Sequence, residues 1–470
     1  MYVKKLWKLI NTWQFLATIA VLVVVAGIVI LCVFPKQVGR IIADLFTWFI
    51  AAIANPDTAV VNLKHTVLGF FPESWRPWLS HVCNFLPIVA VFPGLFALIT
   101  WAERKILGRI QNRYGPNRVG PYGLLQPIAD GLKMLSKEDI VPRAADKVLH
   151  FLAPIVLVVS ALLVYSVLPM GRNMTPANLD VGVIAFFAIG AISEVAVFIA
   201  GWASRNKYSI LGALRGVAQM ISYEIPLVLS AVTVVMVVGT LSTSAIVHAQ
   251  GGGHWFVFTP WGFVGFLLFF IASIAEVNRS PFDIPEAESE IIAGYHTEYS
   301  GFKFAIFFLA EYLAAIALSG LGVTLFLGGW QAPGLEWLAA WLPSWIAWVP
   351  LVIDAIFEYI PSWLWFLIKA MSLILLMIWV RGTLPRLRSD QLMGFAWKFM
   401  LPMSLINILV AGIWYKMVEG TTARWQGVGA WLLSAAILFA CYWALSTFGF
   451  RQVVKKREYR DSEGKLIATA

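Results

Sequence analysis

The sequence predicts an all-α, polytopic membrane protein with about ten transmembrane helices and additional amphipathic helices at the membrane interface. Of its 470 residues, 60% are hydrophobic and 13% are charged, and the mean hydropathy is +0.77. A soluble domain has roughly 45–50% apolar and about 25% charged residues, so water is not the main solvent of this chain. Its apolar runs also reach the roughly 20 residues that a helix needs to cross the hydrocarbon core.

Ten apolar runs, separated by polar or charged segments, are predicted to span the membrane. They cover residues 13–34, 84–102, 150–169, 181–203, 216–240, 261–277, 304–328, 362–380, 399–417 and 427–449. The first run is too long for the apolar region of a signal peptide, so we expect a retained span. The stretch 41–54 and the Trp-rich insertion 331–361 would break the alternation of charged loops if they crossed, so we expect both on the outer surface.

The distribution of positive charge predicts the orientation. Nine Lys and Arg residues lie between 104 and 147, whereas residues 241–260 and 329–361 contain none. Because Lys and Arg concentrate in cytoplasmic loops, the 104–147 segment and both termini are expected on the cytoplasmic side. These loops also account for the formal net charge of +9, so no nucleic-acid partner is expected.

Cysteine and histidine residues give no sign of a redox centre or a metal site. Cys32, Cys83 and Cys441 lie in separate apolar segments, without the close spacing of iron–sulfur or zinc ligands. The six histidines are scattered, and no two are four residues apart. We therefore expect no metal ion and no redox centre bound by this chain.

A basic loop at residues 101–123 reads WAERKILGRIQNRYGPNRVGPYG. Its closely spaced Gly and Pro residues predict a fixed, tightly turned backbone, although an inside-positive loop that merely anchors its span is the alternative. An amphipathic segment follows, whose apolar face is typical of a helix that lies flat in the membrane interface. That face consists of Leu124, Leu125, Ile128, Leu132 and Leu135.

An acidic loop, residues 276–298, lies between two predicted spans. It contains one arginine, Arg279, and six carboxylates, which are Glu276, Asp283, Glu286, Glu288, Glu290 and Glu298. A hydrated acidic loop explains this composition as well as a functional loop does. Where such a loop is buried, like charges this close require some carboxylates to take up protons near neutral pH.

Carboxylates also occur within the membrane spans themselves. Glu194, Glu224 and Glu311 lie inside predicted spans, and Glu276 ends another. An ionised carboxylate at a helix centre costs about 2.5–3.5 kcal/mol on insertion scales. Four such residues on four spans therefore predict a buried proton-exchanging path, while pairing with a nearby Lys or Arg is the alternative at any single site. Lys369 is interpreted as an internal counter-charge or a snorkelling side chain.

Three segments carry a resemblance to a known family. They read QNRYGPNRVG, QPIADGLKMLSKED and NRSPFDIPEAESEIIAGYHTEYSG, and shorter similarities occur at 206–215, 222–224 and 381–391. Together they resemble the H subunit of bacterial NADH:quinone oxidoreductase, respiratory complex I, over roughly residues 84–416. The resemblance implies a core of eight spans at 84–416, with two additions. These are an N-terminal extension, 1–83, with one extra span and a surface helix, and a C-terminal part, 417–470, with one extra span and a basic tail.

The resemblance implies a membrane subunit of a proton-pumping enzyme in the bacterial plasma (inner) membrane. This membrane subunit would form much of the quinone chamber and would couple quinone reduction to proton translocation. A quinone, either ubiquinone or menaquinone, would be the substrate, with no iron–sulfur cluster or flavin in this chain. Its partners would be the peripheral cluster-bearing and quinone-reducing subunits, the neighbouring membrane subunits and the lipid bilayer.

Two groups of residues receive roles from the matching motifs. The residues of the quinone chamber and its entry would be Arg104, Arg113, Arg118, Arg279 and Asp283. The proton-coupling carboxylates would be Asp130, Glu194, Glu224, Glu276, Glu286, Glu288, Glu290, Glu298 and Glu311. Quinone reduction would create negative charge, and the acidic loop would pass the resulting protonation changes to the buried glutamates.

Alternative functions stay open at this point. The main one is the membrane anchor of a related hydrogenase-type or ferredoxin-driven complex, which would couple similar carboxylates without NADH. A secondary transporter would show internal repeats and discontinuous helices in matching halves, and the sequence shows neither. A scaffold without chemistry would not need the buried charge.

Overall fold

The computed structural model describes residues 75–285, 293–334, 360–418, 424–451, 458–460 and 466–469, together with residues 64, 68, 73 and 357. The chain divides into two compact units, Met1–Ser80 and His81–Ala470, and the fold given below is that of the second unit. The predicted span 13–34, the predicted surface helix 41–54 and most of the insertion 331–361 lie outside the described residues.

The described chain is almost entirely helical. Its α-helices are α4 (Arg76–Ile110), α5 (Gln126–Ser136), α6 (Lys147–Leu163), α7 (Gly182–Gly190), α8 (Ile192–Ala203), α9 (Lys207–Val238), α10 (Thr243–Ala249), α11 (Pro260–Glu276), α13 (Gly301–Phe326), α16 (Ser362–Thr383), α17 (Ser389–Phe395), α18 (Leu401–Val418) and α19 (Arg424–Arg451). Short 3-10 turns are η1 (Pro121–Gly123), η2 (Val164–Val167), η3 (Gly251–Gly253), η4 (Phe256–Phe258) and η5 (Gly294–His296), and a π-helical turn, η6 (Ala396–Met400), joins α17 to α18. The exception is an antiparallel hairpin of β1 (Glu458–Arg460) and β2 (Leu466–Thr469).

The described helices confirm a polytopic helical membrane protein. Eight of them are long and apolar enough to cross a membrane, and the pair Gly251–Phe258 and Pro260–Glu276, bent by 64°, makes up to nine. These nine coincide with the predicted spans from 84–102 to 427–449. The predicted span 181–203 consists of α7 and α8, which meet at Ala191. The predicted span 399–417 starts earlier, at Ser389, because α17, η6 and α18 run on from one another.

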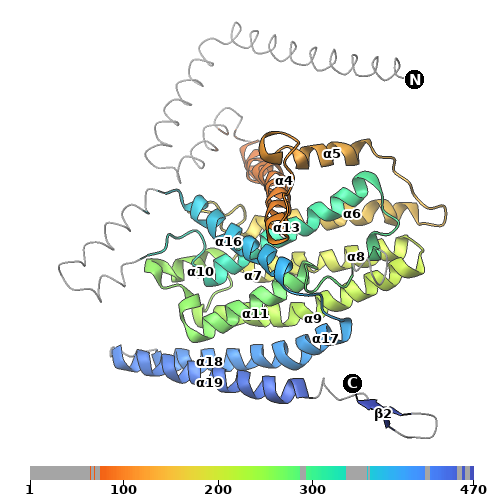
Figure 1. Ribbon diagram of the computed structural model, residues 1–470. Helices are drawn as coiled ribbons and strands as arrows, with labels where there is room; N and C mark the ends of the chain where they lie inside the picture. Colours follow the sequence, from red (N-terminus) through yellow and green to blue (C-terminus); the bar gives the residue numbers. More distant parts are fainter. Residues whose placement is uncertain are drawn as a thin grey trace, which may run out of the picture. The chain divides into compact units, whose positions relative to one another are not determined.

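Two central helices organise the packing of the second unit (Figure 1). Helix α9 packs against α8, α11 and α18, and α13 packs against α6, α11 and α16. The stretch of α13 from Leu313 to Phe326 is buried almost without interruption. Helices α18 and α19 lie side by side at one edge. Because α13 contacts helices that precede it and a helix that follows it in the chain, residues far apart in the sequence can meet beside it.

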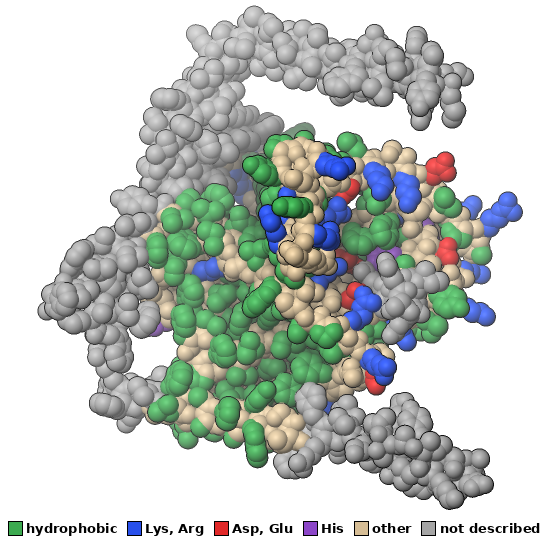
Figure 2. Space-filling model, in the orientation of Figure 1, with side chains coloured by type: hydrophobic (Ala, Val, Ile, Leu, Met, Phe, Trp, Pro, Cys, Tyr) green, Lys and Arg blue, Asp and Glu red, His purple; other side chains and the backbone are tan. Residues whose placement is uncertain are grey.

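The exposed surface is apolar over a wide area, as the composition predicts. Large hydrophobic side chains such as Phe151, Trp202 and Leu409 are more than a third exposed. In Figure 2, hydrophobic side chains cover much of the face shown, whereas charged side chains gather toward the side that carries α5. Helix α5 forms within the predicted amphipathic segment, and its apolar face, including Ile128 and Leu132, is exposed. Its location in the membrane interface stays a prediction.

Lys369, on α16, is buried among backbone carbonyl groups. The sequence had suggested an internal counter-charge or a snorkelling side chain, and neither describes these surroundings. Its Nζ donates to the carbonyl oxygens of Leu327 at 2.7 Å, Gly329 at 3.1 Å and Gln331 at 2.6 Å. These three bonds use all the donors of an ammonium group, and the Trp255 ring lies 4.1 Å away. Lys369 therefore stabilises the carbonyl-rich end of α13, where a positive charge is favoured by the helix dipole.

The turn η5 packs tightly on α9 at a glycine. A Cβ atom built on Gly212 would lie 2.6 Å from the Cα of Gly294 and 3.0 Å from the Tyr295 nitrogen. Since these are backbone atoms, they cannot give way as a flexible side chain would. Close approach of α9 and η5 therefore requires glycine at position 212.

Gly212→Ala should destabilise the fold by about 1–3 kcal/mol, the usual cost of overpacking. The loss is measured as a lower melting temperature of the purified protein in detergent. Gly131→Ala is the matched control, because a Cβ there meets nothing within 4 Å and alanine is the better helix former. An unchanged melting temperature for Gly212→Ala would contradict the close packing of η5 on α9.

Candidate functional site

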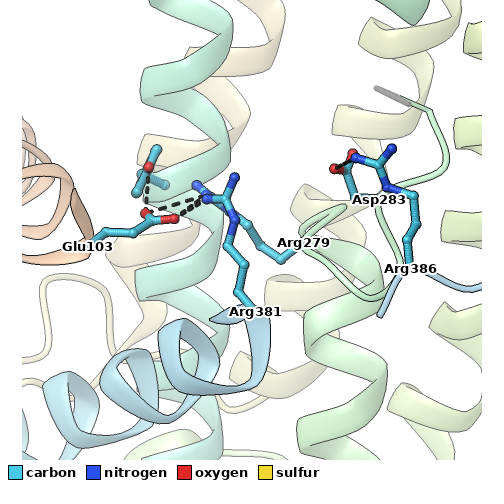
Figure 3. A network of polar contacts seen from close by, with 6 residues as sticks. Glu103, Arg279, Asp283, Arg381 and Arg386 are labelled. Atoms are coloured by element: carbon cyan, nitrogen blue, oxygen red, sulfur yellow. Dashed lines mark hydrogen bonds and ion pairs between the residues drawn. The ribbon is translucent and has the colours of Figure 1, made fainter. Parts of the chain in front are cut away.

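Three side chains from separate parts of the chain converge on one buried carboxylate. Glu103, on α4, has a side chain that is only 5% exposed. The Nη1 atom of Arg279, just after α11, lies 3.3 Å from Glu103 Oε1, and Arg381 on α16 pairs with the same oxygen. Tyr312, on α13, donates its hydroxyl hydrogen to Glu103 Oε2 at 2.6 Å. These four residues form the Glu103 cluster, and Figure 3 shows the two arginines turned toward Glu103.

The Glu103 cluster carries more positive than negative charge. Its members are two arginines, one glutamate and a tyrosine, so their formal charges sum to one positive charge. Burial alone would lower the pKa of Arg279, but the Tyr312 and Glu103 side chains outweigh it and hold the pKa above its ordinary value. The Arg279 guanidinium also lies 3.9 Å from the centre of the Tyr312 ring, a cation–π contact. The cluster is thus suited to a ligand that carries or develops negative charge.

A cavity lies against the Glu103 cluster. The space there that is free of protein atoms amounts to about 350 Å³, a figure that includes open solvent. Beside the four members of the cluster, its lining is entirely apolar and consists of Ile99, Ala315, Ile374, Met377 and Ile378. A lining that is charged in one part and apolar in the other fits an amphiphilic ligand.

Asp283, four residues after Arg279, is paired with a residue that the sequence interpretation did not name. Its Oδ2 accepts a hydrogen bond from Arg386 Nη2 at 2.7 Å, and the Asp283 side chain is 14% exposed. The Leu387 N–H donates to the Pro281 carbonyl at 3.1 Å. The start of the acidic loop is therefore fastened to the segment that follows α16, as Figure 3 shows for Asp283 and Arg386.

A second and larger pocket gathers carboxylates from separate spans. Glu224 on α9, Glu276 at the end of α11 and Glu311 on α13 all line it, together with Asn278 and Tyr295. The space there that is free of protein atoms amounts to about 800 Å³, a figure that includes open solvent. Glutamates from three helices therefore line one pocket of the folded chain. We call this site the glutamate pocket.

Two further residues adjoin the glutamate pocket. Glu194, on α8, is buried, and its carboxyl group lies near that of Glu224. The Tyr295 hydroxyl donates to Glu311 Oε1 at 2.9 Å, and His296 Nε2 lies 3.6 Å from the same oxygen. Chains of carboxyl, hydroxyl and imidazole groups at these distances can pass protons.

Arg104, Arg113 and Arg118 of the basic loop line neither of these two pockets. Arg104 Nη1 pairs with Asp130 Oδ2 at 2.6 Å, which joins the loop to α5. Asp130 is not among the residues that line the glutamate pocket, and its role as a proton-coupling carboxylate stays a prediction. Arg113 and Arg118 line an open groove together with Arg104, and Arg113 Nε donates to Gln111 at 2.7 Å.

The remaining predicted residues of the acidic loop divide into two sets. Glu298 accepts a hydrogen bond from Asn206 Nδ2 at 2.7 Å and is not among the residues that line the glutamate pocket. Glu286, Glu288 and Glu290 lie outside the described residues. Within the described part of the chain, no group of three or more His, Cys, Asp or Glu side chains could hold a metal ion.

Several residues of these sites were missed by the sequence interpretation. Glu103 is the single acidic residue within the basic loop, which was a usable signal for a paired charge. Arg381 opens the segment 381–391, and His296 lies inside the acidic loop, so both stood in segments already singled out. Tyr312 follows Glu311 directly but has no distinguishing pattern around it. Their partners could not be read from sequence because each lies in a different segment of the chain.

Comparison with known proteins gives consistent matches. A family model described as NADH dehydrogenase matches residues 83–412. The chain is 46% identical over 334 residues to the H subunit of NADH-quinone oxidoreductase from Dehalococcoides mccartyi (strain CBDB1), and the match covers 71% of this chain and 86% of that relative.

Two other bacteria supply similar relatives. An H subunit of NADH-quinone oxidoreductase from Geobacter metallireducens is 45% identical over 348 residues, covering 72% of this chain and 97% of the relative. The corresponding protein of Brevibacillus brevis is 44% identical over 351 residues, covering 75% and 97%. These matches favour an NADH-linked complex over the hydrogenase-type alternative. With its helical membrane spans, the chain belongs to the family of the H subunit of NADH-quinone oxidoreductase, a membrane component of complex I.

Proposed function

We propose that the chain forms part of the quinone chamber of complex I and couples quinone reduction to proton translocation. The observation that carries this proposal is that the Glu103 cluster and the glutamate pocket are joined twice. Glu311 and Tyr312 are consecutive on α13, and Glu276 and Arg279 are three residues apart. A change of charge at one site therefore acts on the other over a very short path.

The quinone would enter the cavity beside the Glu103 cluster. A quinone has a polar ring with two carbonyl oxygens and an apolar tail, which matches the mixed lining of this cavity. Arg279 and Arg381 supply charged N–H donors that would stabilise negative charge on the ring as it is reduced. Ile374, Met377 and Ile378 would contact the apolar part of the molecule.

The glutamate pocket would take up and release the protons. Two neighbouring carboxyl groups such as Glu194 and Glu224 repel each other when both are ionised, and they can hydrogen-bond to each other only when one carries a proton. Tyr295 and His296 extend this set to Glu311. Negative charge on the quinone would change how many protons these groups hold, and that change is the coupling step.

We infer the orientation and partners from the charge distribution. The end that bears the 104–147 segment faces the cytoplasm, with both termini on the same side. The groove of Arg104, Arg113 and Arg118 would then face the peripheral subunits, and the acidic loop with Glu286, Glu288, Glu290 and Glu298 would extend the proton path from that side. The segments 1–83 and 417–470 would be additions to the family core at 84–416.

Glu311→Gln should abolish most proton translocation while the KM for quinone changes by less than about twofold. Glutamine keeps the size of the side chain and an acceptor for Tyr295, but it cannot exchange a proton. The assembled complex in sealed vesicles allows both quantities to be measured in one preparation. The exposed Glu138→Gln is the control and should pump normally. Normal pumping by Glu311→Gln would refute the proton role of the glutamate pocket.

Ala315→Phe should raise the KM for quinone by about tenfold, equivalent to about 1.4 kcal/mol of lost binding. The larger ring would occupy the apolar part of the cavity beside the Glu103 cluster. Steady-state quinone reduction by the assembled complex measures the change. Val159→Phe, on the exposed face of α6, is the control for adding bulk elsewhere. An unchanged KM in Ala315→Phe would exclude this cavity as the quinone site.

A further inference from the structure

The turn after α11 supplies one residue to each of the two sites. Glu276 ends the helix and lines the glutamate pocket. Arg279 follows three residues later and pairs with Glu103. Asn278, between them, also lines the glutamate pocket. Any displacement of Arg279 must therefore be absorbed within these few residues or passed on to Glu276.

The backbone of this turn is held in one specific conformation. The Arg279 N–H donates to the Ile274 carbonyl at 3.2 Å, and the Asn278 N–H donates to the Ala275 carbonyl at 3.2 Å. Asn278 has a φ of 52°, in the left-handed region. This pattern is the Schellman motif that ends many helices, and Asn is one of the few residues other than glycine that accept the conformation. The motif fixes the direction of Arg279 relative to Glu276.

Gln219 fastens the same turn to α9, the helix that carries Glu224. Its side chain is buried, with 1% of the residue exposed. The Nε2 atom donates to the Ala275 carbonyl at 2.8 Å, to Asn278 Oδ1 at 3.2 Å and to the Phe282 carbonyl at 2.7 Å. Because backbone carbonyls only accept hydrogen bonds, the amide nitrogen and not the amide oxygen must face the turn.

The amide nitrogen of Gln219 has more acceptors around it than hydrogens to donate, so its hydrogen bonds can change partners. An amide nitrogen has two hydrogens, and three acceptors surround this one, so at least one contact is shared. The Oε1 atom of the same amide is buried and has no partner among the described residues. A small movement of the turn can therefore redistribute the bonds of Nε2 without breaking all of them.

We propose that Gln219 is a positioning residue that links the Glu103 cluster to the glutamate pocket through residues 275–282. This proposal rests on the proposed function and names the physical connection within it. A change of charge beside Arg279 displaces the turn at residues 275–282. Because Gln219 ties this turn to α9, the displacement changes the position of Glu276 relative to Glu224. The link is reciprocal, because protonation in the glutamate pocket equally biases the position of Arg279.

The test is Gln219→Leu in the assembled complex, reconstituted in sealed vesicles. Leucine keeps a similar volume but removes all three hydrogen bonds. Quinone reduction should stay within about twofold of the unchanged complex, while the number of protons translocated per electron should fall by about twofold or more. A merely structural role would lower the amount of complex without changing this ratio. An unchanged ratio in Gln219→Leu would overturn the proposal.

Gln250→Leu is the matched control. Gln250 is also fully buried, and its Nε2 donates to the Thr324 carbonyl at 2.9 Å and to the Ile246 carbonyl at 3.3 Å, while its Oε1 accepts from the Gly328 N–H at 2.9 Å. None of these bonds involves the Glu103 cluster or the glutamate pocket. This variant should lose a comparable buried amide, with a similar fall in stability, but keep the normal ratio of protons to electrons. A lowered ratio in Gln250→Leu as well would show that the loss is unspecific.

Two further variants keep the test decisive. Asn278→Gly retains the left-handed turn but removes one acceptor of Gln219, so it should lower the ratio even where Gln219→Leu fails to assemble. A normal ratio in Asn278→Gly would then overturn the link.

Glu276→Gln separates this link from the proposed function. Normal pumping by Glu276→Gln refutes the proposed function itself. If Glu276→Gln loses pumping while Gln219→Leu and Asn278→Gly keep the normal ratio of protons to electrons, only the link through Gln219 is refuted.

Discussion

The pairing of Glu103 with two arginines is the interaction on which the arrangement of the described helices depends. A carboxylate or guanidinium inside an apolar protein is very costly unless it is paired and hydrogen-bonded. Glu103, Arg279, Tyr312 and Arg381 come from α4, the turn after α11, α13 and α16, and Glu103 and Arg381 are 278 residues apart in the chain. These segments have to meet because none of the charges can be left alone. A cavity lies beside Glu103 because the side chains of these segments do not fill all the space between them.

The two buried charge sites are chemically different. In the Glu103 cluster the carboxylate is held by guanidinium groups that stay protonated at any physiological pH, so its charge is fixed. The described lining of the glutamate pocket contains no Lys or Arg. Glu311 accepts a hydrogen bond from Tyr295 and lies beside His296, and its charge also interacts with that of Arg279 in the Glu103 cluster. Protons there can be exchanged between neighbouring groups. A site of fixed charge next to a site of exchangeable protons is what electrostatic coupling requires.

Two backbone connections place these sites next to each other, and both are short. On α13, successive residues face different sites, because adjacent side chains of a helix point about 100° apart. At the end of α11, the Schellman turn reverses the chain within three residues and achieves the same separation. Gln219 adds a third connection, from α9 to that turn. The connections therefore consist of one helix face and one helix end that is held by hydrogen bonds.

The sequence by itself determined the helical membrane architecture and the family. Hydropathy over about 20 residues is a local property, so nine spans of the described chain could be located, and long specific segments carried the resemblance. It also identified the four glutamates on four spans. Only the tertiary structure decided their partners. It paired Asp130 with Arg104 instead of the glutamate pocket, brought Glu194 to Glu224, gave Glu103 its two arginines and turned Lys369 to backbone carbonyls. Each of these choices depends on which face of one helix meets another, and residue spacing within a single segment does not contain that information.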